Sequence, residues 1–117
     1  MHLTSSQRKL GSLSALCIGQ KMGGWVYIMT NKRDGVLYIG VTADLPARIV
    51  QHREGKGSAF CHRYGLDRLV YAEPHENIHD AITREKAMKA WKRAWKIELI
   101  EQTNPEWSDL FQHLAIP

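Results

Sequence analysis

The stretch that most constrains the fold, residues 25–52, has the pattern of two short strands followed directly by a helix. Residues 25–30 and 36–41 are rich in aromatic and β-branched side chains. The five residues between them, Asn-Lys-Arg-Asp-Gly, have turn chemistry. The sequence therefore predicts a hairpin whose second strand leads straight into a helix.

Each predicted strand carries one tyrosine, Tyr27 on the first and Tyr38 on the second. Hairpin pairing can bring the two hydroxyl groups near each other, and Gly40 leaves room for a group to approach the strand. Tyrosines of this kind commonly place the ring in the core and the hydroxyl at its rim. A proton acceptor is the alternative role, which requires nearby positive charge because free tyrosine has a pKa near 10.

The predicted helix, capped by Thr42 or Asp44, places two basic side chains on a face that also carries apolar residues. Residues three, four and seven positions apart share a face. Here these residues are Leu45, Arg48, Ile49 and His52. A salt-bridge role for Arg48 and a surface position for His52 are the ordinary alternatives to a functional role.

The remaining chain predicts a third strand over residues 68–73, ended by Pro74, and then a second helix. That helix begins at a cap on Asp80 and runs to about residue 101, with a bend after Trp91. Its apolar spacing places Trp91 and Trp95 in the core. A last amphipathic segment around residues 107–114 closes the core.

Glu85 falls on the apolar face of this second helix, where an unpaired carboxylate is costly. It is either paired with Arg48, placed at a partly exposed edge, or bound to a metal ion such as Mg²⁺, which one or two carboxylates commonly hold. If the helix is continuous, one basic stripe follows it: Lys86, Lys89, Arg93 and Lys96. Such a stripe is usually a solvated face, and beside a phosphate site it becomes a backbone-contact surface.

The chain has 117 residues, which favours one domain, over residues 24–117, preceded by a flexible leader over residues 1–23. No apolar run reaches the roughly 20 residues of a membrane helix. A net charge of +4 weakly favours a polyanionic partner. Cys17 and Cys61 are expected to be free thiols in a reducing cytosol, so we expect a cytoplasmic protein.

Together these residues resemble the GIY-YIG nuclease superfamily, in particular its small stand-alone bacterial members. Val26-Tyr27-Ile28 stands at the first signature triplet, and Tyr38-Ile39-Gly40 is the second triplet intact. Arg48 matches the family arginine, His52 the histidine of some branches, and Glu85 the metal-binding glutamate. The first triplet lacks its glycine. Ile97 stands near the position where many members carry an asparagine, and Asn104 comes later.

The resemblance implies an α/β (α+β) fold with a three-stranded antiparallel sheet flanked by helices. It also implies metal-dependent hydrolysis of DNA phosphodiester bonds with Mg²⁺ or Mn²⁺. In this mapping Tyr38 is the base or its relay, Tyr27 supports it and binds phosphate, and His52 shares a proton or contacts phosphate. Arg48 steadies the phosphate and Glu85 holds the metal. Lys56 is a further candidate for phosphate contact.

No second domain for DNA targeting is present in this sequence, so we expect low sequence specificity, or targeting by a protein partner, in a setting such as DNA repair or recombination. The alternative function is a nucleic-acid-binding module whose catalytic site is weak or inactive. Ile97 and the basic stripe motivate this alternative.

Overall fold

The computed structural model describes residues 23–114, which form one three-stranded antiparallel sheet with helices on both faces. This confirms the predicted fold class. Residues 1–22 of the predicted leader, with Cys17, lie outside the described residues. The elements are β1 (Gly24–Thr30), β2 (Leu37–Thr42), α2 (Leu45–Arg53), α3 (Ala59–Tyr64), β3 (Arg68–His75), α4 (Ile78–Lys89), α5 (Arg93–Thr103) and α6 (Phe111–Leu114).

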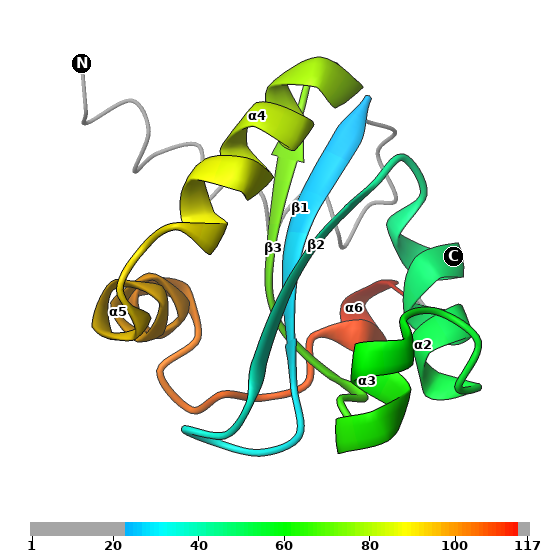
Figure 1. Cartoon of the computed structure of the whole chain (residues 1–117), viewed down its shortest axis with the longest axis vertical. Helices are drawn as coiled ribbons and strands as arrows, with labels where there is room; N and C mark the ends of the chain where they lie inside the picture. Colours follow the sequence, from blue (N-terminus) through cyan, green and yellow to red (C-terminus); the bar gives the residue numbers. More distant parts are fainter. Residues whose placement is uncertain (1–22, 115–117) are drawn as a thin grey trace.

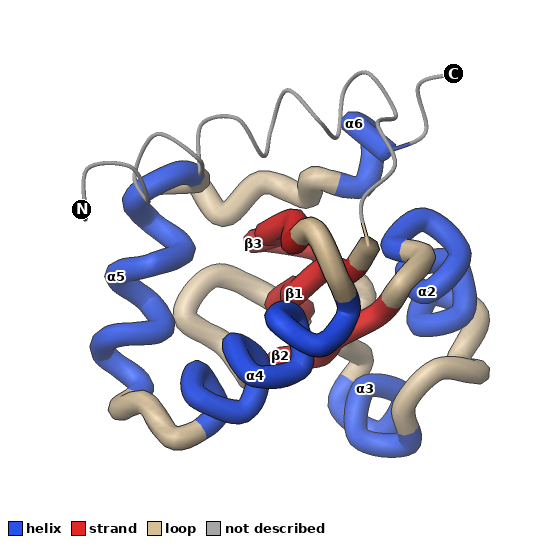
Figure 2. The backbone as a smooth tube through the Cα atoms, turned by 90° about the horizontal axis from the view of Figure 1, so that it is seen from above, coloured by secondary structure: helices blue, strands red, loops and turns tan. Residues whose placement is uncertain are grey.

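The strand order is β2-β1-β3, so β1 is the central strand and all seven of its residues are buried. Its side chains alternate between two separate cores. Tyr27 belongs to a core with residues of α2 and α3, whereas Val26 and Ile28 belong to a second core with α4 and α5. Figures 1 and 2 show α2 and α3 on one side of the sheet and α4 and α5 on the other.

The hairpin and the helix that follows it match the prediction closely. In the observed register, Tyr27 lies opposite Gly40 and Met29 lies opposite Tyr38. Asp44 caps α2 by accepting a hydrogen bond from the backbone N–H of Ala47 at 3.2 Å. The spacing of apolar residues and the turn residues were sufficient to predict the hairpin and the helix, because both signals are local.

The bend predicted after Trp91 is a full break in the second helix, because α4 ends at Lys89 and α5 begins at Arg93. The true N-cap of α4 is Asn77, three residues before Asp80. Trp91 is half-buried and packs against the second core, whereas Trp95 is 51% exposed, so the predicted core position is wrong for Trp95. The turn rotates α5 so that Leu99 and Ile100 face the sheet instead.

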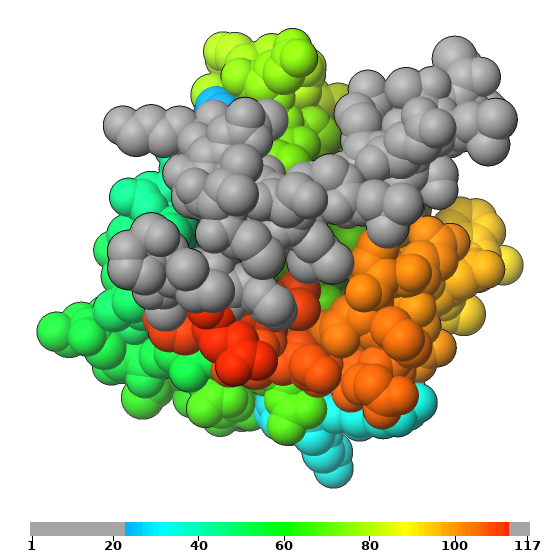
Figure 3. Space-filling model, turned by 180° about the vertical axis from the view of Figure 1, so that it is seen from behind, coloured from blue at the N-terminus to red at the C-terminus, as the bar shows by residue number. Residues whose placement is uncertain are grey.

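Pro74 does not end the third strand, which continues to His75. β3 is an edge strand, where a proline is tolerated because its missing N–H does not interrupt the hydrogen bonds between interior strands. The last segment does close the core as predicted, since Trp107 and Leu110 are buried. From behind, α5 and the residues after it (orange to red) form one surface, with the β1–β2 turn (cyan) at its lower edge (Figure 3).

A buried carboxylate on β3 fixes how α4 lies on the sheet. Glu73 accepts hydrogen bonds from Tyr71 at 2.5 Å, from His75 at 2.6 Å and from Arg84 Nε at 3.0 Å. Burial raises the pKa of Glu73, but the bonds from Tyr71 and Arg84 outweigh this and hold the pKa below its usual value. The sequence analysis did not single out this cluster.

Replacing Arg84 by alanine should leave Glu73 buried with fewer donors. We expect the free energy of unfolding to fall by about 1–3 kcal/mol, the typical cost of an unsatisfied buried acceptor. Urea unfolding followed by circular dichroism measures it. Lys86→Ala, an exposed basic residue on the same helix, is the matched control and should stay within about 0.5 kcal/mol of the parent. Equal midpoints for both variants would contradict the role of Arg84.

Candidate active site

The candidate site begins inside the fold, at a hydrogen bond between the central strand and α2. The hydroxyl oxygen of Tyr27 lies 2.9 Å from Nε2 of His52, and both residues are buried. Which of the two donates depends on the tautomer of the imidazole. The remaining ring nitrogen, Nδ1, has no partner among the described residues.

Two glycines make room for this pair. A Cβ on Gly40 would lie 2.4 Å from Cζ and the hydroxyl oxygen of Tyr27. A Cβ on Gly57, in the loop before α3, would lie 2.5 Å from Nδ1 of His52. The sequence indicated that a group could approach the backbone at Gly40, and in the structure that group is the ring of Tyr27.

Tyr38 and Arg48 complete the cluster on the same face of the sheet. The ring centroid of Tyr38 lies 6.2 Å from that of Tyr27 and 5.6 Å from that of His52. Arg48 precedes His52 by one helical turn and is half-buried, as is Tyr38. These four predicted site residues therefore come together, and Tyr38 and Arg48 are the two that reach solvent.

Burial sets the protonation of the two inner groups. It raises the pKa of Tyr27, Tyr38 raises it further, and the charge of Arg48 opposes them. Burial also lowers the pKa of His52, and Arg48 adds to this effect. At neutral pH Tyr27 is therefore protonated and His52 is neutral, so they share a proton in a hydrogen bond without carrying charge.

Glu85 comes from α4, on the opposite face of the sheet from Tyr27. Arg84 faces β3 through its bond to Glu73. Glu85 lies on the buried face of α4, and this helix packs over β1 and β2. The structure thus brings Tyr27, Tyr38 and His52 together with Arg48 nearby, and places Glu85 on the helix that packs against the other face.

The environment of Glu85 fits a metal held by one carboxylate together with water and substrate phosphate. Glu85 is buried, and its Oε2 lies 2.6 Å from Nζ of Lys89, whose side chain is 55% exposed. The predicted alternative of pairing with Arg48 is not what the structure shows. Glu73 is saturated by donors, whereas Glu85 has one flexible lysine beside it. The described residues contain no group of three or more ligands that would hold a metal by protein atoms alone.

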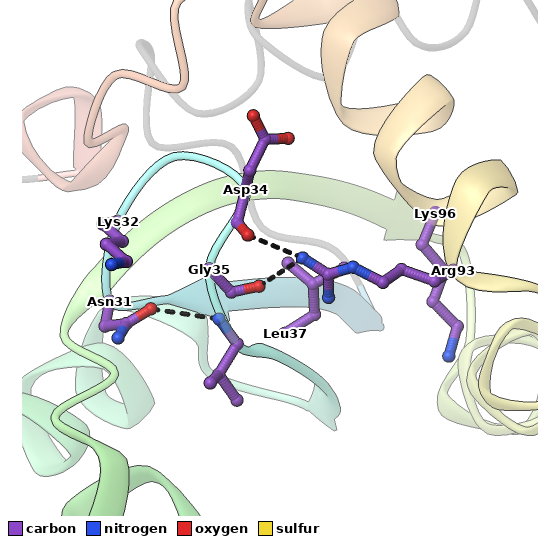
Figure 4. A pocket seen from close by; sticks show the side chains of 8 residues that line it. Asn31, Lys32, Asp34, Gly35, Leu37, Arg93 and Lys96 are labelled. Atoms are coloured by element: carbon purple, nitrogen blue, oxygen red, sulfur yellow. Dashed lines mark hydrogen bonds between the residues drawn. The ribbon is translucent and has the colours of Figure 1, made fainter.

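The predicted basic stripe is divided between α4 and α5, because the helix is not continuous. Its halves still adjoin, since Nζ of Lys96 donates to the carbonyl of Lys89 at 3.4 Å. Nη2 of Arg93 donates to the carbonyls of Asp34 and Gly35, at 2.8 and 2.6 Å, in a pocket of about 660 Å³ beside the hairpin turn (Figure 4). Lys56 and Lys86 are exposed.

Asn104 is a structural residue. Its Nδ2 donates to the carbonyl of Val70 at 3.1 Å and its Oδ1 accepts from the N–H of Ser108 at 3.0 Å. Ile97 packs against the second core. The sequence analysis missed Phe60, whose ring stacks on Tyr38 at 6.2 Å with an interplanar angle of 28°. No local signal marks Phe60, because the contact joins a helix to a strand more than 20 residues earlier.

Comparison with known proteins shows which family the chain is similar to. A model of the GIY-YIG catalytic domain matches residues 23–98. A UPF0213 protein of Staphylococcus epidermidis is 33% identical over 78 residues, covering 67% of this chain and 94% of the relative. A UPF0213 protein of Staphylococcus haemolyticus is 36% identical over the same length. The NMR structure of a UPF0213 protein from Bacillus halodurans aligns with a TM-score of 0.48 and 28% identity, covering 82% of this chain and 100% of that one.

Replacing Gly40 by alanine should force Tyr27 out of its position, because the new methyl group would overlap a fully buried ring. We expect a loss of about 1–3 kcal/mol in the free energy of unfolding, as for other overpacked cores. Urea unfolding measures it. In a Tyr27→Leu background the overlapping atoms are absent, so the loss in the double mutant should be smaller than the sum of the two single losses. Additive losses would contradict the contact.

The neutral state of His52 predicts a pH dependence of stability. A folded-state pKa below the unfolded value of about 6.5 means that this stabilisation is complete above pH 6.5 and is lost as the pH falls. Between roughly pH 7 and pH 5, the free energy of unfolding should therefore fall less steeply in His52→Gln than in the parent. Urea midpoints across this range provide the measurement. His79→Gln, an exposed histidine on α4, should keep the slope of the parent.

Proposed function

This chain belongs to the GIY-YIG catalytic domain family, a family of nucleases, and from that premise we propose that it is a metal-dependent nuclease with low sequence specificity. The proposed substrate is DNA and the reaction is hydrolysis of a phosphodiester bond. The observation that carries the proposal is the contact of Tyr27, Tyr38 and His52, with Arg48 beside them, at the edge strand of the sheet.

In the proposed reaction, the two tyrosines have different tasks because their surroundings differ. Tyr27 is buried and stays protonated, so it acts as a hydrogen-bond partner held in place by His52. Tyr38 is half-exposed and reaches water, so it is the residue that deprotonates or relays the proton of the attacking water. His52 holds Tyr27 and can take part in sharing that proton.

Arg48 supplies the positive charge on this side of the site. Its half-exposed guanidinium can donate to a phosphate, and it offsets the extra negative charge that develops in the transition state. Glu85 would hold Mg²⁺ or Mn²⁺ from the other face of the sheet edge. When bound, such an ion polarises a phosphoryl oxygen and stabilises the leaving oxygen.

The proposed contact with DNA is electrostatic. Lys56, Lys86, Lys89, Arg93 and Lys96 are the proposed contacts to the phosphate backbone, which carries no sequence information. Low specificity follows from such contacts, and a protein partner would supply any targeting. We place the activity in the cytoplasm, in DNA repair or recombination. Within residues 23–114, no helix has both the length and the apolarity to cross a bilayer.

A second candidate function is DNA binding without cleavage. Two observations favour it: Lys89 already neutralises Glu85 at 2.6 Å, and Ile97 packs in the apolar core. In that case binding falls with rising salt and survives the loss of Glu85.

Tyr38→Phe and Glu85→Gln should each lower the rate of DNA cleavage by about 100-fold or more, because each removes a group required in the transition state. The assay uses the purified full chain with Mg²⁺ or Mn²⁺ on single-stranded, nicked, branched and duplex DNA, scored by gel electrophoresis.

Glu98→Gln, which alters an exposed carboxylate on α5, is the matched control and should cut like the parent. Cleavage by both site variants at the rate of the parent would overturn the proposal. Salt-sensitive binding without cleavage by the parent would favour the second candidate function.

A further inference from the structure

Three aromatic rings form a continuous strip that leads from the candidate site to solvent. Tyr38 stacks on Phe60, and Phe60 contacts Tyr64 with ring centroids 4.8 Å apart. Phe60 and Tyr64 lie one turn apart on α3. We call these three residues the aromatic strip. It begins at the tyrosine to which the proposed reaction assigns the proton transfer.

The outer two rings are not needed to anchor α3. Phe60 and Tyr64 are each 43% exposed, and Cys61 is the buried residue of this helix. Single exposed apolar residues are ordinary, but neighbouring exposed rings next to a polar site indicate a binding surface. Within residues 23–114, the rings of Phe60 and Tyr64 are therefore only partly covered by other residues and are accessible to a ligand.

The charge beside the strip indicates what it binds. The guanidinium of Arg63 lies 5.6 Å from the ring centroid of Tyr64, and Lys56 is exposed in the loop before α3. Arg48 lies on the site side. Aromatic faces interleaved with basic groups are the features that bind single-stranded nucleic acid, because each unpaired base can stack and each phosphate can be neutralised.

The bases of duplex DNA cannot stack on these rings. Its bases are stacked on one another and present only their edges in the grooves. An unpaired nucleotide can instead place its face against Phe60 or Tyr64. Since Phe60 is stacked on Tyr38, a base seated there brings the neighbouring phosphate toward the candidate site.

We propose that the aromatic strip seats an unpaired base beside the phosphate to be cleaved, so that single-stranded or branched DNA is the preferred substrate over continuous duplex. This inference rests on the proposed nuclease function for its consequence in cleavage. The seating of the base is a binding event that can be measured separately from cleavage.

The test compares binding of a fluorescein-labelled single strand and of the matching duplex, by anisotropy with EDTA present so that nothing is cut. Phe60→Leu and Tyr64→Leu keep apolar bulk but remove the ring. Each should weaken binding of the single strand by about 5- to 100-fold and leave binding of the duplex unchanged. Phe60→Trp keeps a ring and should bind the single strand as the parent does.

Trp95→Leu is the matched control. Trp95 is 51% exposed and has Nζ of Lys92 at 5.7 Å from its ring centroid, so it offers the same chemistry on α5, away from Tyr38. Its loss should change neither affinity. If the leucine variants do not fold, the added fluorescence of Phe60→Trp over the parent still reports stacking, since a single strand should quench it and a duplex should not.

Equal losses for single strand and duplex, or no loss in either, would overturn the inference. So would a change in oligomeric state of Phe60→Leu in sedimentation without a change in DNA binding, because the strip would then contact a second copy of the chain. Ring-dependent binding of the single strand by a protein that cuts no DNA would retain the base seat and reject the proposed nuclease function.

Discussion

The structure depends on one central strand that is buried on both faces and paired along both edges. Because β1 has no exposed residue, each polar group that it carries must find a partner inside the protein. The hydroxyl of Tyr27 finds it in His52, on the helix that covers this face. That bond ties β1 to α2 and places a neutral, proton-sharing pair directly below the half-exposed Tyr38. The candidate site is thus an outward extension of the core.

The residues of the proposed site lie on both faces of the sheet around β1 and the edge strand β2. Tyr38 and Arg48 lie on the face of the sheet that α2 covers, and Glu85 belongs to α4, which covers the other face. The rotation of α4 is set by Arg84, which binds the buried Glu73. Two buried carboxylates on the same face of the sheet therefore differ in their partners. Glu73 accepts hydrogen bonds from three side chains and attaches α4 to β3, whereas Glu85 is paired with the exposed side chain of Lys89.

Much of the site was predictable because its signals are short in range. Strand alternation and the turn residues set the register that pairs Tyr27 with Gly40, and helical spacing places Arg48 and His52 on one face. The sequence predicted only a bend after Trp91, and not two separate helices, because no proline or glycine marks the turn between Lys89 and Arg93. Tertiary packing decides that turn: it buries Leu99 and Ile100, and Arg93 binds the hairpin turn. Trp95 is exposed for the same reason.

The sequence by itself determined the hairpin, the capped helix after it and the set of residue types that identifies the family, since these depend on neighbours within a few positions along the chain. Only the tertiary structure decided which groups are charged and which surfaces stay open. Burial keeps His52 neutral and Tyr27 protonated, the hydrogen bonds of Glu73 attach Arg84 of α4 to β3, and the packing of α3 leaves Phe60 against Tyr38. Burial and contacts between distant segments are properties of the folded chain, so no local pattern in the sequence records them.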